Sequence, residues 1–235
     1  MADYPTLSAL KPRTLELTRN LKTVAVNIGR NAHPSWYLPS VPLCCSATGY
    51  RQMPTWKDRG RVEYLASRRS AAVRKAIQAY PDAEHIIMVD SYYLNQPQAI
   101  VGLIKEYEDN AEEIVLGAST WRLHARPPPL SSFWDTWTTP ECNKLSIEQV
   151  GWKQVGGVGG ILIASRRAWE NAGWGVPEPF PDSGSEMNYF CSQTRLPVYV
   201  SLNIKAIHPE PQPYSLLKRS RIRLHLGRFI PHIRR

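Results

Sequence analysis

Short apolar runs alternate with amphipathic segments along this chain, and the alternation narrows the possible folds more than any other feature. Lys22–Gly29 (KTVAVNIG) is rich in β-branched residues and closes on glycine, as a strand does. His85–Asp90 (HIIMVD), Glu113–Ser119 (EIVLGAS) and Gly160–Ser165 (GILIAS) have the same character. Because these runs are continuously apolar, they predict an α/β fold with a largely parallel sheet that helices cover on both faces.

Helices are expected between these strands. Ser67 is expected to cap the first helix, which Pro81 would stop. A second helix is expected from Asn95, because Gln98 three residues later makes a start resembling a capping box and Pro97 falls in the first turn.

The chain is expected to hold one α/β domain. Arg166–Gly173 predicts a short helix ended by glycine, and Leu196–Leu202 and Ile204–His208 predict two late extended segments. An apolar fraction of 43% is enough for a hydrophobic core. We therefore expect an N-terminal extension over residues 1–20, a single domain over 21–208 and a C-terminal tail over 209–235.

The net charge of +9 is concentrated at the C-terminus. No acidic residue follows Glu210, and seven of the nine surplus charges belong to Lys218, Arg219, Arg221, Arg223, Arg228, Arg234 and Arg235. The rest of the chain is nearly neutral, which makes nucleic acid an unlikely partner of the domain and indicates a separate task for the tail.

The expected location is cytoplasmic. No stretch of the sequence is apolar for long enough to span a membrane, and the first residues lack the pattern of a signal peptide. The four cysteines show no CxxC spacing, and free thiols are typical of a reducing compartment.

Asp90 is the first candidate for a functional residue. In open parallel sheets, ligands bind beyond the carboxyl ends of the strands. A carboxylate that projects from a rigid strand end is well placed to hold a divalent cation or a ribose hydroxyl. A plain turn residue or an N-cap is the structural alternative at this position.

Several segments resemble the nucleotide-sugar-dependent glycosyltransferases of the A-type fold (GT-A). In that family an "aRN" pattern on a helix precedes a strand that ends in a DxD motif and a helix that begins near proline. The same layout is found in ASRRSAAVRKAIQAYPDAEHIIMVDSYYLNQPQAIVGLI, residues 66–104. Two later segments are also similar, namely GGVGGILIASRRAWENAGW and FPDSGSEMNYFCSQTRLPVYVSLNIKAIHP. The resemblance covers about Lys22 to His208.

The resemblance implies a metal and diphosphate site at Asp90, which matches the first aspartate of the DxD motif. Tyr92 occupies the position of the second aspartate, and a protonated phenol cannot replace a hard carboxylate on Mn²⁺ or Mg²⁺. His208 matches a late histidine that often completes the family's metal site. A structural role for this histidine is the alternative.

The resemblance also implies a catalytic base. Glu186 falls where inverting members carry the carboxylate that deprotonates the acceptor hydroxyl, and Asp182 is the reserve candidate. An acidic residue near the start of a helix is favoured by the helix dipole in any case, so a capping role for Glu186 is compatible with a catalytic one.

Three further residues are expected to bind the nucleotide-sugar: Asn27, Arg69 and Gly157. Arg69 matches the arginine of "aRN", and a solvated helix face is the alternative for it. Gly157 belongs to a glycine-rich segment that does not form a dinucleotide-binding loop. Close approach of the backbone to a ligand and a simple tight bend both explain it.

Two tryptophans and the tail complete the candidates. Trp134 and Trp137 lie where acceptor-binding elements occur in the family, although tryptophans at this spacing are often core residues. The apolar residues of the tail share one helical face, with arginines elsewhere. A basic amphipathic helix of this kind is typical of binding to an anionic membrane, and packing on protein is the alternative. Arg219, Arg221, Arg223 and Arg228 are the residues expected at that contact.

We therefore expect a GT-A-like glycosyltransferase that uses a nucleoside-diphosphate sugar and a divalent cation, Mn²⁺ or Mg²⁺. The expected acceptor is a hydroxyl of a lipid-linked or surface glycan, and the protein would sit peripherally on a membrane. The alternatives are a catalytically inactive binding or scaffold module of the same fold and a basic protein associated with nucleic acid.

Overall fold

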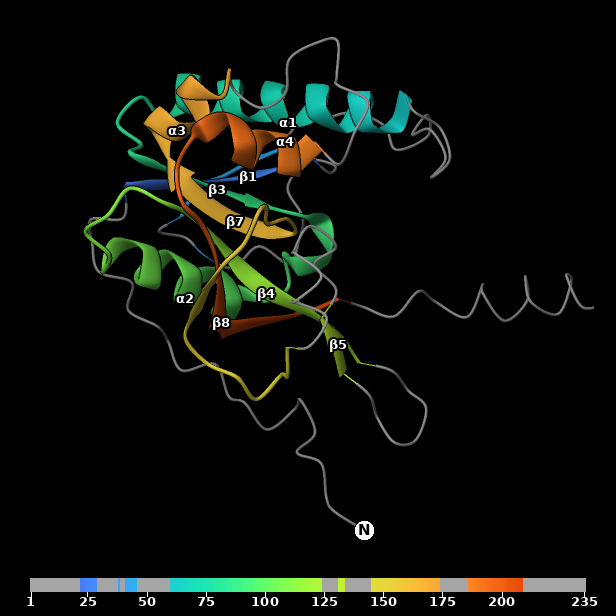
Figure 1. Ribbon diagram of the computed structural model, residues 1–235. Coiled ribbons are helices and arrows are strands. Elements are labelled where there is room, and N and C mark those ends of the chain that lie inside the picture. The colour runs from blue at the N-terminus through green and yellow to red at the C-terminus, as the bar shows by residue number, and fades with distance from the viewer. Residues whose placement is uncertain are drawn as a thin grey trace, which may run out of the picture.

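The described part of the chain forms one mixed sheet with helices on both faces (Figure 1). A computed structural model describes residues 22–28, 38, 41–45, 60–123, 131–133, 145–173 and 186–208. The strands are β1 (Thr23–Asn27), β2 (Leu43–Cys45), β3 (His85–Val89), β4 (Val115–Leu123), β5 (Ser131–Phe133), β6 (Trp152–Gln154), β7 (Ile161–Ser165) and β8 (Val198–His208). The helices are α1 (Gly60–Ala79), α2 (Pro97–Glu108), α3 (Arg166–Asn171), α4 (Glu186–Thr194) and the 3₁₀ helix η3 (Ser91–Tyr93).

The strand order is β2-β1-β3-β7-β4-β8-β6, and β5 pairs with β4 beside this path. β1 is parallel to β2 and β3, and β4 is parallel to β8. The expectation of a mostly parallel sheet is corrected at the centre, where β7 runs antiparallel to both β3 and β4. A strand buried on both faces is continuously apolar whatever its direction, so the sequence of β7 carried no sign of this reversal.

Two apolar layers flank the sheet. One face of the sheet, covered by α1, α3 and α4, carries the side chains of Val24, Val26, Ile86 and Met88. On this face the Trp169 ring stacks on Phe190. Intervening residues such as Ala25, Ile87 and Val89 point to the opposite face, against α2. This division follows the period of two along each strand, and it fixes which side of the sheet each helix can cover.

Both predicted helix starts differ from the structure. α1 begins at Gly60, so Ser67 lies inside the helix and does not cap it. α2 begins at Pro97 with Gln96 as its N-cap residue, and no side chain caps it. The amide of Gln96 is instead bound to a backbone segment far along the chain, at Ile207.

The two late extended segments form one strand, β8. A shift of register at Ala118 and Ser119 of β4 lets β8 continue to His208 across the intervening residues. β2, β5 and β6 were not expected, because each has only three residues and too little periodicity to be distinguished from a loop.

Candidate functional site

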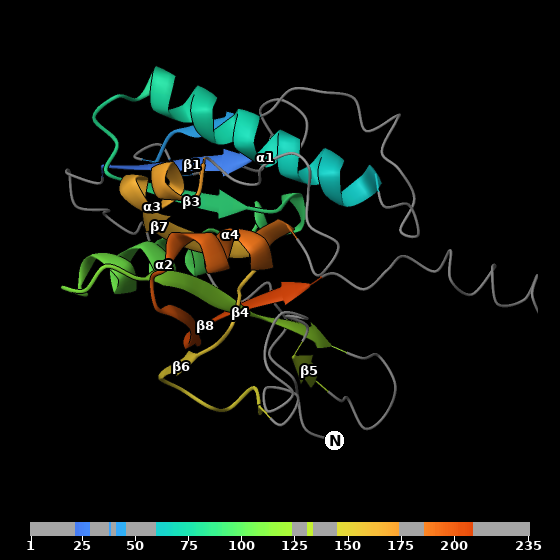
Figure 2. The same ribbon diagram turned by 45° about the horizontal axis from the view of Figure 1, so that its top comes forward.

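The candidate residues gather at one edge of the sheet. β1, β3 and β8 point the same way, so Asn27, Asp90 and His208 all lie at their carboxyl ends (Figure 2). Because β7 runs in the opposite direction, its beginning lies at this edge too, and the Asp90 backbone N–H donates to the Gly160 carbonyl at 2.7 Å. The sheet thus brings together residues from distant parts of the chain.

Arg69 of α1 joins two of the predicted carboxylates. Its Nε donates a hydrogen bond to Glu186 Oε1 at 3.0 Å, and its NH1 lies 3.0 Å from Asp90 Oδ1. The Asp90 contact is an ion pair without the alignment of a good hydrogen bond. The exposed fractions of the three side chains are 6% for Arg69, 8% for Glu186 and 28% for Asp90. We call these three residues the Arg69 cluster.

The formal charges of the Arg69 cluster do not cancel. Burial of the Arg69 guanidinium acts to lower its pKa, but Asp90 and Glu186 outweigh this effect and raise the pKa above its ordinary value. Arg69 therefore stays charged at every physiological pH. One formal positive charge faces two negative ones, so the cluster carries a formal charge of −1. The solvated helix face considered for Arg69 is wrong.

The Asp90 side chain does not cap the helix that follows it. Asp90 occupies the N-cap position of η3 with an extended backbone, yet its side chain makes no capping hydrogen bond. Its carboxylate faces Arg69 instead. The structural alternative of an N-cap holds for the position of Asp90 but not for its side chain, which belongs to the cluster.

Asn27 holds the end of β3 in place. Its side chain is fully buried, and its Nδ2 donates to the Val89 carbonyl at 2.5 Å. Its Oδ1 lies 3.4 Å from the Ser91 hydroxyl, which is the donor in that contact. The amide thus contacts the chain on either side of Asp90. In this conformation the buried Asn27 amide supports the backbone around Asp90.

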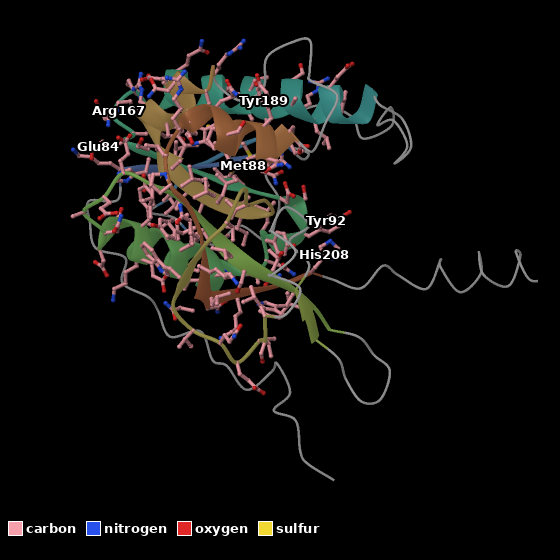
Figure 3. The ribbon with its side chains drawn as sticks, in the orientation of Figure 1. Glu84, Met88, Tyr92, Arg167, Tyr189 and His208 are labelled. Carbon is pink, nitrogen blue, oxygen red and sulfur yellow. The ribbon has the colours of Figure 1, made fainter. Side chains whose placement is uncertain are left out.

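Tyr92 and His208 lie side by side at the same edge (Figure 3). Their ring centroids are 5.1 Å apart with the planes tilted by 45°. Tyr93, which is buried, packs edge-on against the same imidazole at 6.1 Å. Gln96 fixes this end of β8, since its amide both accepts from the Ile207 N–H at 2.9 Å and donates to the Ile207 carbonyl at 2.8 Å.

Gly157 packs closely against the start of α4. A Cβ atom added at Gly157 would lie 3.3 Å from Asn188 Cα and would collide with the Asn188 side chain. Asn188 is two residues after Glu186, so this glycine lets the chain pass next to the helix that carries Glu186. Gly160 has a φ of +70°, which favours glycine, and a Cβ there would lie 2.9 Å from the Tyr93 ring. The tight bend thus describes Gly160, whereas the close approach at Gly157 is to the protein's own helix α4, and an approach to a ligand stays a prediction.

The expected divalent cation finds few ligands here. Among the residues that the structure describes, no group of three or more His, Cys, Asp or Glu side chains is arranged to hold a metal ion. Asp90 offers one carboxylate, of which Oδ1 already faces Arg69, and the Tyr92 and His208 rings pack on each other. This donor set does not fit a metal centre held by these residues alone, so we derive no chemical step through a metal.

The remaining candidates lie outside the described residues. They are Asp182, Trp134, Trp137, Arg219, Arg221, Arg223 and Arg228. Their predicted roles as base, acceptor site and membrane contact stay predictions. Of the candidates that the structure describes, Asp90 and Glu186 each contact Arg69, and Tyr92 contacts His208.

Two residues at this edge were missed by the sequence reasoning. Gln96 binds Ile207, 111 residues away, and Asn188 packs on Gly157. No local pattern signals either contact. The burial of Arg69, in contrast, was visible in the sequence pattern. Arg69 lies four residues before Val73, so both residues share one face of α1.

Within the described ranges, no helix combines the length and apolar character that crossing a bilayer requires. No known family model matches the chain. A comparison with curated proteins likewise gives no match. The residues at the carboxyl edge of the sheet are therefore the basis for a functional proposal.

Proposed function

We propose that this protein is a glycosyltransferase that moves a sugar from a nucleoside-diphosphate sugar to an acceptor hydroxyl. The observation that carries the proposal is the gathering of seven sequence-predicted residues at one edge of the sheet: Asn27, Arg69, Asp90, Tyr92, Gly157, Glu186 and His208. They come from separate segments of the chain, and five of them, Arg69, Asp90, Tyr92, Glu186 and His208, match positions in the GT-A pattern. Ligands of open α/β sheets bind at this edge.

The formal charge of the Arg69 cluster limits what Asp90 can bind. A diphosphate brought directly against a net charge of −1 would be repelled, because Arg69 already faces two carboxylates. The Asp90 carboxylate instead suits a hydrogen-bond donor, such as a ribose hydroxyl of the donor nucleotide. Mn²⁺ or Mg²⁺ stays the proposed cofactor, brought by the diphosphate, and no residue of this edge is assigned to it.

Glu186 is the proposed base of an inverting displacement, with Asp182 in reserve. A carboxylate within reach of the acceptor hydroxyl removes its proton as the oxygen attacks the anomeric carbon, which is worth about 10²- to 10⁴-fold in rate. Glu186 has one carboxylate oxygen on Arg69 and only 8% of its side chain exposed. Its second oxygen would have to face the acceptor.

Replacing each carboxylate by its amide separates these two candidates. Loss of the base lowers kcat while leaving the dissociation constant of the donor nearly unchanged. We expect this result for Glu186→Gln or for Asp182→Asn, but not for both. Urea unfolding of each variant controls for the loss of the Arg69 contact in Glu186→Gln.

A binding module without turnover is the second candidate. The burial of Glu186 and its pairing with Arg69 favour it, because one carboxylate oxygen already binds the arginine and little of the side chain is open to an acceptor. Incubation with donor sugars and glycan acceptors distinguishes the two: an enzyme releases nucleoside diphosphate, whereas a binding module retains intact donor.

A thermal-shift screen tests the donor claim. The full chain is heated with nucleoside diphosphates and nucleotide-sugars, each with and without Mn²⁺ or Mg²⁺. A specific ligand at a hundred times its dissociation constant stabilises the folded state by about 2.7 kcal/mol. We expect a shift with one nucleotide class, which Asp90→Asn weakens. If no nucleotide or nucleotide-sugar shifts the transition, the proposal is wrong.

The basic tail is the proposed membrane contact, and its support is the charge and spacing of its sequence alone. Liposomes with anionic lipid should bind the full chain more tightly than a chain that ends at Pro209. Equal binding of both chains would exclude this role. Steep salt-dependent binding to arbitrary duplex DNA or RNA would instead favour the nucleic-acid alternative.

A further inference from the structure

Tyr92 is the most exposed aromatic side chain among the described residues, with an exposed fraction of 60%. An exposed aromatic residue is ordinary when it stands alone on a surface. Tyr92 does not stand alone, because its ring packs against the His208 ring with the centroids 5.1 Å apart (Figure 3). Tyr92 is also only two residues after Asp90 in the sequence. It lies at the edge of the sheet where ligands of such folds bind.

Buried neighbours restrain the position of the His208 ring. Tyr93 is only 2% exposed and packs edge-on against the His208 imidazole. Its backbone N–H donates to the Asp90 carbonyl at 2.9 Å, so Tyr92 lies within a tight turn that begins at a residue of the Arg69 cluster. Gln96 then binds both backbone groups of Ile207, next to His208. An aromatic surface fixed in this way loses little conformational entropy when a ligand packs on it.

The chemistry around the rings suits a sugar. A pyranose has an apolar face of C–H groups and a rim of hydroxyls, so its site needs a flat apolar surface with polar groups beside it. Tyr92 provides the surface, the His208 imidazole borders it, and the Asp90 carboxylate, 28% exposed, accepts hydroxyl hydrogen bonds. A nucleobase stacked on the Tyr92 ring is the competing occupant, and the calorimetric comparison below distinguishes it from a pyranose.

We propose that Tyr92 and His208 form a platform for the apolar face of a pyranose ring, with Asp90 at its polar rim. The inference rests on the proposed function and extends it, because it assigns the sugar-contacting surface to the position where the related motif has an aspartate. Tyr92 is then a substrate-binding residue rather than a defective metal ligand.

Saturation-transfer NMR on the full chain tests the platform without any nucleotide. The probes are the methyl glycosides of glucose, galactose, mannose and N-acetylglucosamine. We expect transfer to the ring C–H protons of one pyranose face in at least one of them. Tyr92→Phe should keep this transfer, because the aromatic face is unchanged. Tyr92→Leu should lose most of it, and folding is not at issue since Tyr92 is largely exposed.

A calorimetric comparison places the sugar relative to the nucleotide. The dissociation constants of a nucleotide-sugar and of its nucleoside diphosphate are measured for the wild type, Tyr92→Phe and Tyr92→Leu. In the leucine variant we expect the nucleotide-sugar to bind about 3- to 10-fold more weakly, with the nucleoside diphosphate unchanged. Equal weakening of both ligands would mean that Tyr92 stacks on the nucleobase, and it would overturn the pyranose assignment.

The two proposals fail in different ways. If no nucleotide binds but the glycosides show transfer that depends on Tyr92, the donor claim is wrong and the platform stands as a glycan-binding site. If nucleotides bind but no glycoside shows such transfer and the leucine variant binds every ligand like the wild type, the platform is wrong. His208→Ala should reproduce the Tyr92→Leu result in weaker form.

Discussion

Arg69 Nε donates a hydrogen bond to Glu186 Oε1 at 3.0 Å, across 117 residues of chain. This contact joins α1 to the first residue of α4 over the end of β3. Because both side chains are almost completely buried, neither charge has water as an alternative partner. The pair is therefore a structural element of the candidate site as well as a part of its chemistry.

Removal of the Arg69 guanidinium should strongly destabilise the fold. Arg69→Ala leaves the buried carboxylate of Glu186 without its partner and removes the ion pair of Asp90. Breaking a buried pair from one side costs about 3–5 kcal/mol. Urea unfolding followed by tryptophan fluorescence measures this loss as a decrease in the free energy of unfolding.

Arg68→Ala is the matched control for this substitution. The Arg68 guanidinium lies 5.1 Å from the centre of the Tyr64 ring, in a contact worth about 0.5–1 kcal/mol. In a double-mutant cycle with Glu186→Gln, the Arg69 substitution should show a coupling of about 0.5–3 kcal/mol. A loss of stability in Arg69→Ala no larger than that in Arg68→Ala would contradict the arrangement.

Asn27→Ala should loosen the segment that carries Asp90. The substitution leaves the Val89 carbonyl without the donor that it has in a fully buried position, at a cost of about 1–3 kcal/mol. Asn27→Asp should be at least as damaging, since a carboxylate cannot donate to a carbonyl. Ser91→Ala removes only the longer 3.4 Å contact and should cost less than 1 kcal/mol, by the same measurement.

The neighbouring glycines 156 and 157 offer a steric test. An alanine at Gly157 would press on Asn188 at the start of α4, and we expect a loss of about 1–3 kcal/mol. At Gly156 a Cβ atom meets nothing within 4 Å, so Gly156→Ala should be neutral or stabilise by about 0.4–1 kcal/mol. Comparing the melting temperatures of the two variants with that of the wild type tests this difference. An equal effect of both alanines would be inconsistent with the packing of α4.

Acidification should weaken the fold through His85. Burial at the start of β3 lowers the pKa of this imidazole from its ordinary 6.5, and nearby Lys22 acts in the same direction while Glu84 opposes them. The ring packs edge-on against Tyr107 at 5.1 Å. The unfolded chain therefore takes up this proton at a higher pH than the folded chain does.

The sign of the effect follows from this difference. As the pH falls from 7.5 through 6.5, the unfolded state gains the proton first and is stabilised, so the free energy of unfolding decreases. Above this window the histidine contributes no pH dependence. Urea midpoints between pH 5.5 and 7.5 should fall less steeply for His85→Gln than for the wild type, with other titrating groups shared by both. Identical slopes would rule out the histidine as the cause.

Local sequence patterns determined the strands and the chemistry at their ends. Continuous apolar runs located β1, β3, β4 and β7, and an aspartate after such a run predicted the edge at which the candidate residues gather. These signals are local, since a strand or a helix face needs only the residues of its own segment. They were therefore available without a structure.

Only the tertiary structure decided the direction of β7, the burial of Arg69 and the use of Gln96. Each depends on residues brought together from far along the chain: β3 and β4 around β7, two carboxylates around Arg69, and Ile207 beside Gln96. A buried charge is stable only where its partners are in place, and sequence spacing carries no record of those partners. The sequence shows that Tyr92 is two residues after Asp90, but the contact of its ring with His208 depends on the fold, because the two residues are far apart in the chain.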